Sequence, residues 1–297
     1  MDIGLSQSPR ARPPRKATRG DLLKSLPPFP AVARELLKII DKDSCTIPDV
    51  ARVIKTDAAF STEVLRLSNS AMLGLRYEVT NILHGVSVLG MNRLRGLVLT
   101  IAMRNMVSGS QSEPAMRRCW RHNLATALVA EWLAEPCWLD KGEAYTAGLL
   151  HDLGILALAA LYPKPFESIL AQCESSTTPS RARMRELEKA NLGATHVEAA
   201  SWLAEEWGLP QVIRAVLARA EDPTPENPTN HSALANLSCD IADAIGFPIV
   251  EPREGVPPVA LVEILPPDLA KTVQPRLHEL AEGVPFKVNA FECEFMN

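Results

Sequence analysis

Apolar residues recur every three or four positions along most of this chain of 297 residues. That spacing gives each α-helix one apolar face, whereas the strict apolar–polar alternation of a strand is almost absent before residue 286. We therefore expect an all-α fold, organised as a two-part helical bundle. Near the end of the chain we expect one helix at Leu269–Ala281, and either one short strand or a loose end at Phe286–Phe295.

Changes in composition predict the domain organisation. Residues 1–20 are rich in arginine and poor in large apolar residues, which is typical of a disordered basic tail. An N-terminal helical part is expected at 21–107 and a second helical part at 115–220. A loop and closing helix should follow at 221–246, before a proline-rich C-terminal extension at 247–297.

Bulk composition excludes several function classes. The net charge is −4 and the pI about 5.9, which argues against a surface for duplex nucleic acid, so nucleic acid is not an expected partner. No apolar run approaches the roughly 20 residues of a membrane span, and the polar N-terminus lacks a signal-peptide core. The six cysteines form no CxxC pair. These features predict a cytoplasmic protein with reduced thiols and no membrane span.

One polar pair interrupts the most apolar stretch of the chain. His151 and Asp152 are adjacent within Gly148–Leu158, and burying such groups costs several kcal/mol unless they are paired or bound. If both lie on a helix, their side chains point about 100° apart and could bracket one ion. The partner could equally be neighbouring side chains and backbone, in a hydrogen-bonded pair that only fixes helix packing.

Three further polar residues lie on predicted helices with apolar faces and could converge on this pair. They are His122, His196 and Asp240. Imidazole and carboxylate ligands from separate helices are the kind of set that binds a divalent metal ion.

The pattern His122 … His151-Asp152 … Asp240 resembles the signature of the HD superfamily of metal-dependent phosphohydrolases. Further motifs, in order over about residues 21–220, are similar to one bacterial branch, the HDOD (HD-related output) domain. These motifs are Leu26-Pro27-Pro28-Phe29-Pro30-Ala31-Val32-Ala33, Leu65-Arg66-Leu67-Ser68-Asn69-Ser70-Ala71, Val88-Leu89-Gly90-Met91-Asn92-Arg93-Leu94-Arg95, Trp120-Arg121-His122, Ala147–Gly154, His196–Ala200 and Glu206–Pro210.

The resemblance implies the metal ligands His122, His151, Asp152 and Asp240, and one divalent metal ion as the cofactor they would hold. The chain departs, however, from the diesterase-active HD-GYP branch. That branch has a lysine after its His-Asp-x-Gly motif, where this chain has Ile155, and a His-His pair where this chain reads Ala218-Arg219-Ala220-Glu221. We therefore expect no catalytic residues.

Two functions follow from the resemblance. The first is a non-catalytic or weakly catalytic signalling module that binds a protein partner or a nucleotide second messenger in bacterial signal transduction. The alternative is a mononuclear metal-dependent phosphohydrolase acting on a nucleotide or phosphate ester, with one ion activating water.

Overall fold

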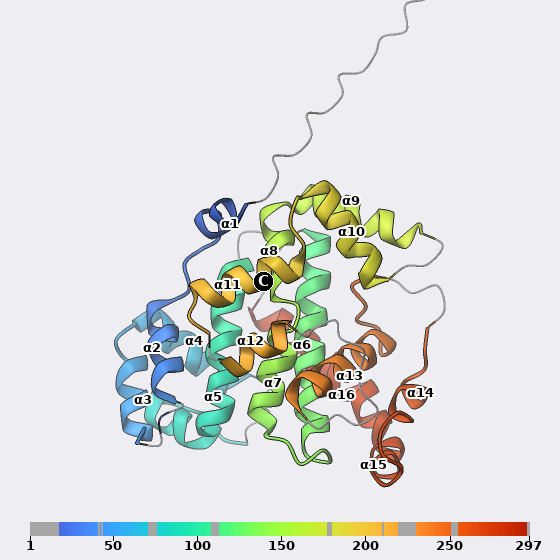
Figure 1. The fold of residues 1–297 in the computed structure, drawn as a ribbon. Helices are drawn as coiled ribbons and strands as arrows, with labels where there is room; N and C mark the ends of the chain where they lie inside the picture. Colours follow the sequence, from blue (N-terminus) through green and yellow to red (C-terminus); the bar gives the residue numbers. More distant parts are fainter. Residues whose placement is uncertain are drawn as a thin grey trace, which may run out of the picture.

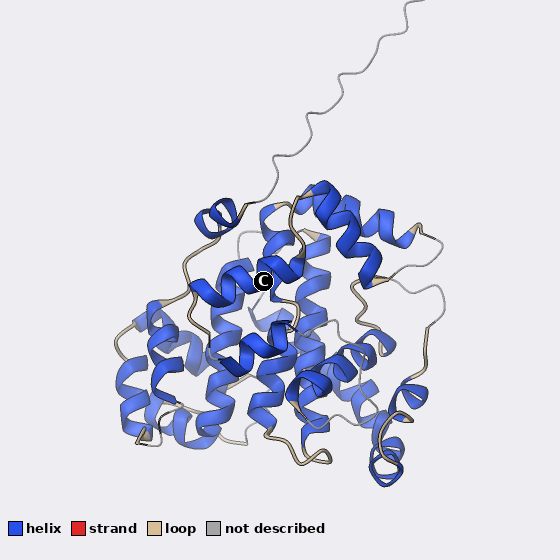
Figure 2. Cartoon of the chain, viewed as in Figure 1, coloured by secondary structure: helices blue, strands red, loops and turns tan. Residues whose placement is uncertain are grey.

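A computed structural model describes residues 18–295, except for 41, 43, 71–75, 108–112, 177–179, 210, 219–229 and 251–254. Every regular element in these ranges is a helix (Figure 2), which confirms the all-α prediction. The predicted basic tail lies outside the described residues up to residue 17. Its last residues differ from the prediction, because α1 (Arg19–Ser25) begins there, with the Thr18 side chain accepting a hydrogen bond from the backbone N–H of Asp21.

The N-terminal group of helices occupies one side of the molecule (Figure 1). It comprises α2 (Ala31–Ile40), α3 (Ile47–Ile54), α4 (Ala58–Ser68) and α5 (Ile82–Val107). Local signals fix two of the starts. Thr46 and Asp49 form a reciprocal capping box before α3, and the Asp57 side chain caps α4.

Helix α5 is kinked at Gly90, where the sequence predicts one helix to stop and another to begin by Asn92. Gly90 has φ 72° and ψ 166°, outside the helical region. A positive φ of this size is accessible to glycine at little cost and is strained for other residues. The predicted break is confirmed, although the two segments run on as one bent element.

The second group of helices surrounds α6, most of whose side chains are buried. It comprises α6 (Pro114–Ala134), α7 (Lys141–Leu150), α8 (Leu153–Leu161), α9 (Pro163–Glu174), α10 (Arg181–Asn191), α11 (His196–Glu206), α12 (Gln211–Ala218) and α13 (His231–Ala244). Helices α7 and α13 pack directly against α6, and α8 packs against α11 (Figure 1).

The C-terminal extension is also helical. It comprises α14 (Pro258–Val262), α15 (Pro267–Val273), a 3₁₀ turn (Gln274–Arg276) and α16 (Leu277–Phe295). The single helix expected at Leu269–Ala281 is interrupted at Pro275, which has no N–H to donate inside a helix.

The expectation of a strand or loose end at Phe286–Phe295 is wrong. Val284, Val288 and Phe291 are buried at intervals of four and three residues, which is helical spacing. The Phe291 ring lies 5.8 Å from that of Trp120, so α16 packs on α6.

One buried apolar cluster extends from Leu22 to Phe291 and joins both groups of helices with the extension. Two stretches, Ile82–Asn105 and Lys141–Leu161, are long and apolar enough to cross a membrane by composition alone. However, 61% and 89% of their most apolar windows are buried inside the protein, as expected for core helices.

Candidate functional site

The pair His151-Asp152 lies at the junction between two helices. Helix α7 ends at Leu150 and α8 begins at Leu153, so His151 caps the first helix and Asp152 precedes the second. The two residues therefore do not lie within one helix, which was the condition for side chains about 100° apart. The break turns both side chains inward, and His151 and Asp152 are only 2% and 1% exposed.

Two glycines allow this junction to sit close to its neighbours. A Cβ atom at Gly148 would lie 2.8 Å from the Cα of Ala127 on α6. A Cβ atom at Gly154 would lie 1.8 Å from the carbonyl oxygen of His196, at the start of α11. Both approaches are to backbone, which cannot rotate away, so only glycine fits and the junction is held from both sides.

The two histidines of the site direct the same ring nitrogen at each other. His122, on α6, is fully buried, and its Nε2 lies 3.2 Å from Nε2 of His151. His122 Nδ1 lies 2.7 Å from the carbonyl oxygen of Phe247, and His151 Nδ1 lies 2.7 Å from that of Gly148. A carbonyl oxygen only accepts hydrogen bonds, so each Nδ1 carries the proton. In a neutral ring, a proton on Nδ1 leaves an Nε2 lone pair that faces the site.

A carboxylate and a guanidinium complete the centre of the site. Asp152 Oδ2 lies 3.1 Å from His151 Nε2 and 3.6 Å from His122 Nε2. Arg181, the first residue of α10, donates from Nη1 to Asp152 Oδ2 at 2.6 Å and from Nη2 to His122 Nε2 at 3.1 Å. Its Nη2 is also 2.9 Å from Sγ of Cys239 on α13. We call these five residues the Arg181 cluster.

Burial and the guanidinium set the protonation states in the Arg181 cluster. Burial alone raises the pKa of Asp152, but the charge of Arg181 outweighs it and holds that pKa well below its usual range. Burial lowers the pKa of His151 and raises that of the Cys239 thiol well above normal. Asp152 is therefore the anion of the cluster and Arg181 its cation, and the Cys239 thiol keeps its proton.

The structure brings together three of the four predicted metal ligands, His122, His151 and Asp152. Asp240, the fourth, is exposed on α13, and the neighbouring Cys239 faces the cluster, with Sγ 3.6 Å from His122 Nε2. One turn further along α13, Asp243 Oδ1 lies 3.0 Å from His122 Nδ1. Adjacent helical residues differ by about 100° in direction, which separates Cys239 from Asp240.

His196 belongs to a separate buried pair. Its Nδ1 and backbone N–H lie 2.7 and 2.9 Å from Oε2 of Glu188, a fully buried residue on α10. The pair joins the start of α11 to α10. The contacts of His196 with Glu188 therefore account for its burial without a role in the Arg181 cluster.

Sequence reasoning missed Arg181 and Cys239. A signal for Arg181 exists, because the Ser180 side chain accepts a hydrogen bond from the N–H of Arg183 and so marks a helix start at residue 181. Nothing in the local pattern, however, shows that this arginine points into the core.

The Arg181 cluster has some features of a metal site and lacks others. His122 Nε2, His151 Nε2 and Cys239 Sγ lie within 4.8 Å of one another. Both imidazoles are held in the tautomer that a metal ligand needs, by hydrogen bonds of the usual kind. Asp152 Oδ1 is buried with no hydrogen-bond partner in the described part of the chain. The donor atoms thus suit an ion, but the guanidinium of Arg181 already contacts three of the residues that would bind it. In this arrangement the cluster does not fit a metal.

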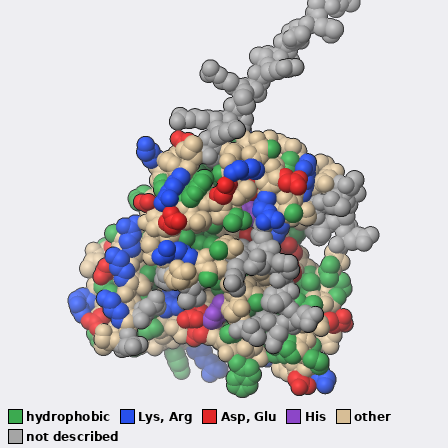
Figure 3. Space-filling model, in the orientation of Figure 1, with side chains coloured by type: hydrophobic (Ala, Val, Ile, Leu, Met, Phe, Trp, Pro, Cys, Tyr) green, Lys and Arg blue, Asp and Glu red, His purple; other side chains and the backbone are tan. Residues whose placement is uncertain are grey.

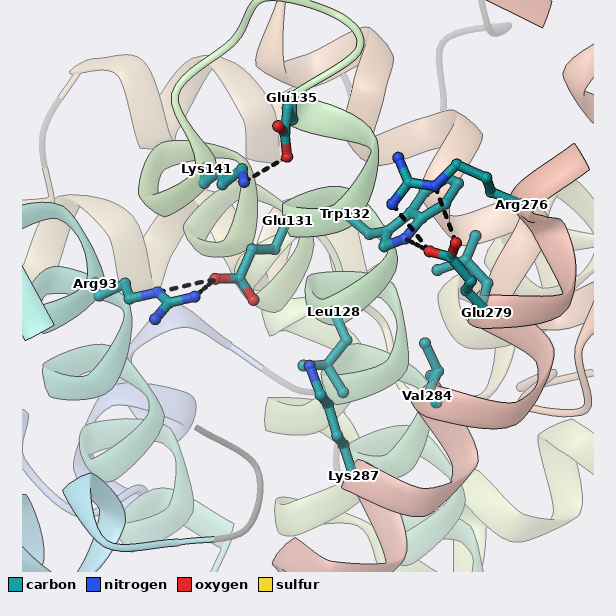
Figure 4. A pocket seen from close by; sticks show the side chains of 12 residues that line it. Arg93, Leu128, Glu131, Trp132, Glu135, Lys141, Arg276, Glu279, Val284 and Lys287 are labelled. Atoms are coloured by element: carbon teal, nitrogen blue, oxygen red, sulfur yellow. Dashed lines mark hydrogen bonds and ion pairs between the residues drawn. The ribbon is translucent and has the colours of Figure 1, made fainter. Parts of the chain in front are cut away.

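A second polar site lies between α6 and α16, a hollow of about 200 Å³ that we call the Trp132 pocket (Figure 4). Six of its charged side chains form three pairs: Arg93 with Glu131, Lys141 with Glu135, and Arg276 with Glu279. The Arg276 guanidinium also stacks 5.1 Å from the centre of the Trp132 ring, and Trp132 donates to Glu279.

Comparisons with known proteins agree with this architecture. A curated protein of uncharacterized function from Treponema pallidum is 24% identical over 200 residues, which are 66% of this chain. Those residues are only 38% of that relative's length, so this chain spans well under half of it.

Solved structures of low identity show the same fold. A protein from Marinobacter aquaeolei proposed to act in signal transduction superposes with a TM-score of 0.71 at 22% identity, over 93% of this chain and 62% of that one. A protein from Shewanella amazonensis proposed to be a phosphohydrolase gives 0.63 at 24%, over 93% and 98%. An HDOD domain protein of unknown function from Geobacter sulfurreducens gives 0.67 at 18%, over 90% and 96%.

The model of the HDOD domain matches residues 26–223, which is more than half of the chain. This range contains four residues of the Arg181 cluster and stops short of Cys239 and the C-terminal extension. The resemblance expected from the sequence motifs is confirmed, and the chain belongs to the HDOD domain family.

Proposed function

We propose that this protein is a non-catalytic HDOD signalling module, which regulates by binding a protein partner or a nucleotide. The observation that carries the proposal is the contact of Arg181 with His122, Asp152 and Cys239. The residues that would form a hydrolytic centre are already bound to the Arg181 side chain.

Hydrolysis by a single metal ion needs an open coordination position at which water is activated. In the Arg181 cluster, Asp152 Oδ2 and His122 Nε2 both accept hydrogen bonds from the guanidinium. His122 and His151 are almost completely buried. Ile155, at the position where the diesterase branch has lysine, is fully buried in the apolar core and offers no charge to a phosphate.

A role in signalling draws support from the Marinobacter neighbour, which is proposed to act in signal transduction. The surface is compatible with a protein or nucleotide partner rather than duplex nucleic acid, because the net charge is −4. On the face in Figure 3, basic and acidic side chains are interspersed. Such partners, and the reduced cysteines, are consistent with a place in the cytoplasm.

The alternative is a mononuclear metal-dependent phosphohydrolase that uses His122, His151, Asp152 and Asp240. Its support is the tautomer of the two histidines, whose Nε2 lone pairs face each other as metal ligands would. The Shewanella neighbour is proposed to be a phosphohydrolase. Against this alternative, Asp240 is exposed on α13.

A hydrolysis assay separates the two functions. Purified protein is incubated with Mg²⁺, Mn²⁺ or Zn²⁺ and with mononucleotides, cyclic dinucleotides and a chromogenic phosphate ester. We expect no turnover above that of His151→Ala, and binding of any nucleotide ligand without its conversion. Metal-dependent turnover that disappears in both His151→Ala and Asp152→Asn would establish the hydrolase instead.

A further inference from the structure

We propose that the Arg181 guanidinium is a built-in replacement for a metal ion, and that a zinc-type ion binds this cluster only when that guanidinium is removed. The inference rests on the proposed function in one respect, since both hold that Arg181 already contacts the residues that would bind a metal ion. It goes further by naming the residue that closes it and the ligand that this residue excludes.

The first step is the shortage of protons inside the cluster. His122 Nε2 and His151 Nε2 are both lone-pair acceptors 3.2 Å apart, and Asp152 Oδ2 lies 3.1 Å from the second of them. Three acceptors this close repel one another unless a cation or a proton donor lies among them. A cation or a proton donor is therefore required for the cluster to stay buried.

Arg181 meets that requirement. Its guanidinium is always charged and carries several donors in one plane, so it can bond to more than one acceptor at once. The observed bonds are to Asp152 at 2.6 Å and His122 at 3.1 Å, with Cys239 Sγ at 2.9 Å. The Arg181 side chain is 25% exposed, whereas the Asp152 side chain is fully buried, so the arginine enters from the surface to neutralise an interior charge.

The second step is that Arg181 excludes a metal ion from the cluster. A metal ion bonded to His122 and Cys239 lies about 2.0–2.3 Å from their donor atoms. Those same atoms are already in contact with Arg181 Nη2. An ion there would touch a guanidinium, and two cations at that distance in a poorly solvated site repel strongly. Arg181 and a divalent ion therefore cannot occupy the cluster together.

The third step is the class of ion. Two imidazole nitrogens and one cysteine sulfur lie within 4.8 Å of one another, with the Asp152 carboxylate alongside. Nitrogen and sulfur donors in this number are typical of Zn²⁺ and its spectroscopic substitute Co²⁺, whereas Mg²⁺ and Ca²⁺ prefer oxygen. Binding would deprotonate Cys239, because the thiolate is the ligand.

The experiment is titration of metal-free protein with Co²⁺, monitored by the absorption of a cobalt–thiolate bond and by calorimetry. Four proteins are compared: wild type, Arg181→Ala, Arg181→Ala/Cys239→Ala, and the control Arg183→Ala. Arg183 is on the same helix but pairs with Glu186 on the surface, so its loss removes an arginine without opening the cluster.

We expect Arg181→Ala to bind one equivalent of Co²⁺ with a thiolate signal, at an affinity on the order of 100-fold or more above wild type. The signal should be absent from wild type, Arg183→Ala and Arg181→Ala/Cys239→Ala. The double variant Arg181→Ala/Asp152→Asn serves if Arg181→Ala does not fold, because it removes the buried charge that Arg181 leaves unpaired and keeps the three donors.

One equivalent of Co²⁺ with a thiolate signal in wild type would overturn the inference. So would folded Arg181 variants that bind none. These outcomes are distinct from failure of the proposed function, which would be turnover by the wild type. A wild type that holds metal without turnover contradicts only the inference drawn here.

Discussion

The Arg181 cluster and the Trp132 pocket both pair arginines with carboxylates, but they differ in burial. Asp152 is fully buried beside Arg181, whereas Arg276 and Glu279 in the pocket are 49% and 40% exposed (Figure 4). An exposed pair gains little over its contacts with water, while a buried charge that loses its partner is strongly destabilised. An arginine–carboxylate pair is therefore essential to the stability of the Arg181 cluster, whereas it contributes little at the surface of the Trp132 pocket.

The largest expected difference between the two sites is in stability. Replacing Arg181 with methionine leaves the Asp152 carboxylate buried without its main partner and should lower the free energy of unfolding by about 3–5 kcal/mol. Arg276→Met should cost far less, because the pair of Arg276 with Glu279 is exposed to solvent. Urea unfolding with a chelator present measures both.

A second variant tests the reason for that difference. Arg181→Met/Asp152→Asn removes both charges, so it should be more stable than Arg181→Met alone. Equal stability of these two variants, or an Arg276→Met loss as large as that of Arg181→Met, would show that burial does not distinguish the sites.

Two glycines extend the comparison to the backbone. Gly154→Ala places a Cβ atom 1.8 Å from the His196 carbonyl, so α8 and α11 must separate, at a cost of about 3 kcal/mol. The Cβ atom of Gly283→Ala, at the edge of the Trp132 pocket, meets no atom of the described residues within 4 Å. It should stabilise α16 by about 0.4–1 kcal/mol. Thermal unfolding of both variants measures the contrast, which a stable Gly154→Ala protein would contradict.

The fold was largely predictable because apolar periodicity reports burial directly. The helix break at Gly90 and the pairing of polar residues in the apolar stretch Gly148–Leu158 could both be inferred. The part of α16 after Ala281 was missed, since Pro285 lies within it and the buried positions Val284, Val288 and Phe291 are few.

The candidate site was only partly predictable, because its remaining members depend on tertiary packing. Arg181 opens a polar helix and resembles a surface residue, and only the tertiary structure shows that its side chain reaches His122 on α6 and Cys239 on α13. Cys239 and Asp240 are adjacent, and only the rotation of α13 decides which of them faces His122. Sequence spacing alone cannot decide which of two adjacent helical residues faces the site.

Acid should affect the Arg181 cluster more than the Trp132 pocket. Burial lowers the pKa of His151 below its ordinary value in the folded state, and the Arg181 charge holds the pKa of Asp152 well below its usual range. The unfolded chain therefore binds protons at both residues before the folded chain does. Their contribution is present above the unfolded pKa values and falls as the pH decreases, first below about pH 6.5 and then below about pH 4.

Chemical unfolding between pH 7 and pH 3 tests this dependence. The slope of stability against pH below 4 should be smaller in Arg181→Met/Asp152→Asn than in wild type. Glu279→Gln is the control from the Trp132 pocket: its hydrogen bond from Arg276 also lowers the pKa of Glu279, but the carboxylate is exposed. A slope reduced more by Glu279→Gln than by the double variant would contradict the assignment.

The smallest expected effect is the response to salt. Raising the ionic strength from about 0.05 M to about 0.5 M shortens the screening length to a few ångströms, so exposed charges interact less. The coupling energy of Arg276 with Glu279, an i,i+3 pair, should be small at low salt and approach zero at high salt. The coupling of Arg181 with Asp152 should change little, because water and ions do not surround the Asp152 carboxylate. Double-mutant cycles at both salt concentrations measure these energies. A coupling at Arg181 that is lost in salt would mean that the guanidinium is solvated and that the cluster is open, which would also remove the basis for excluding a metal ion.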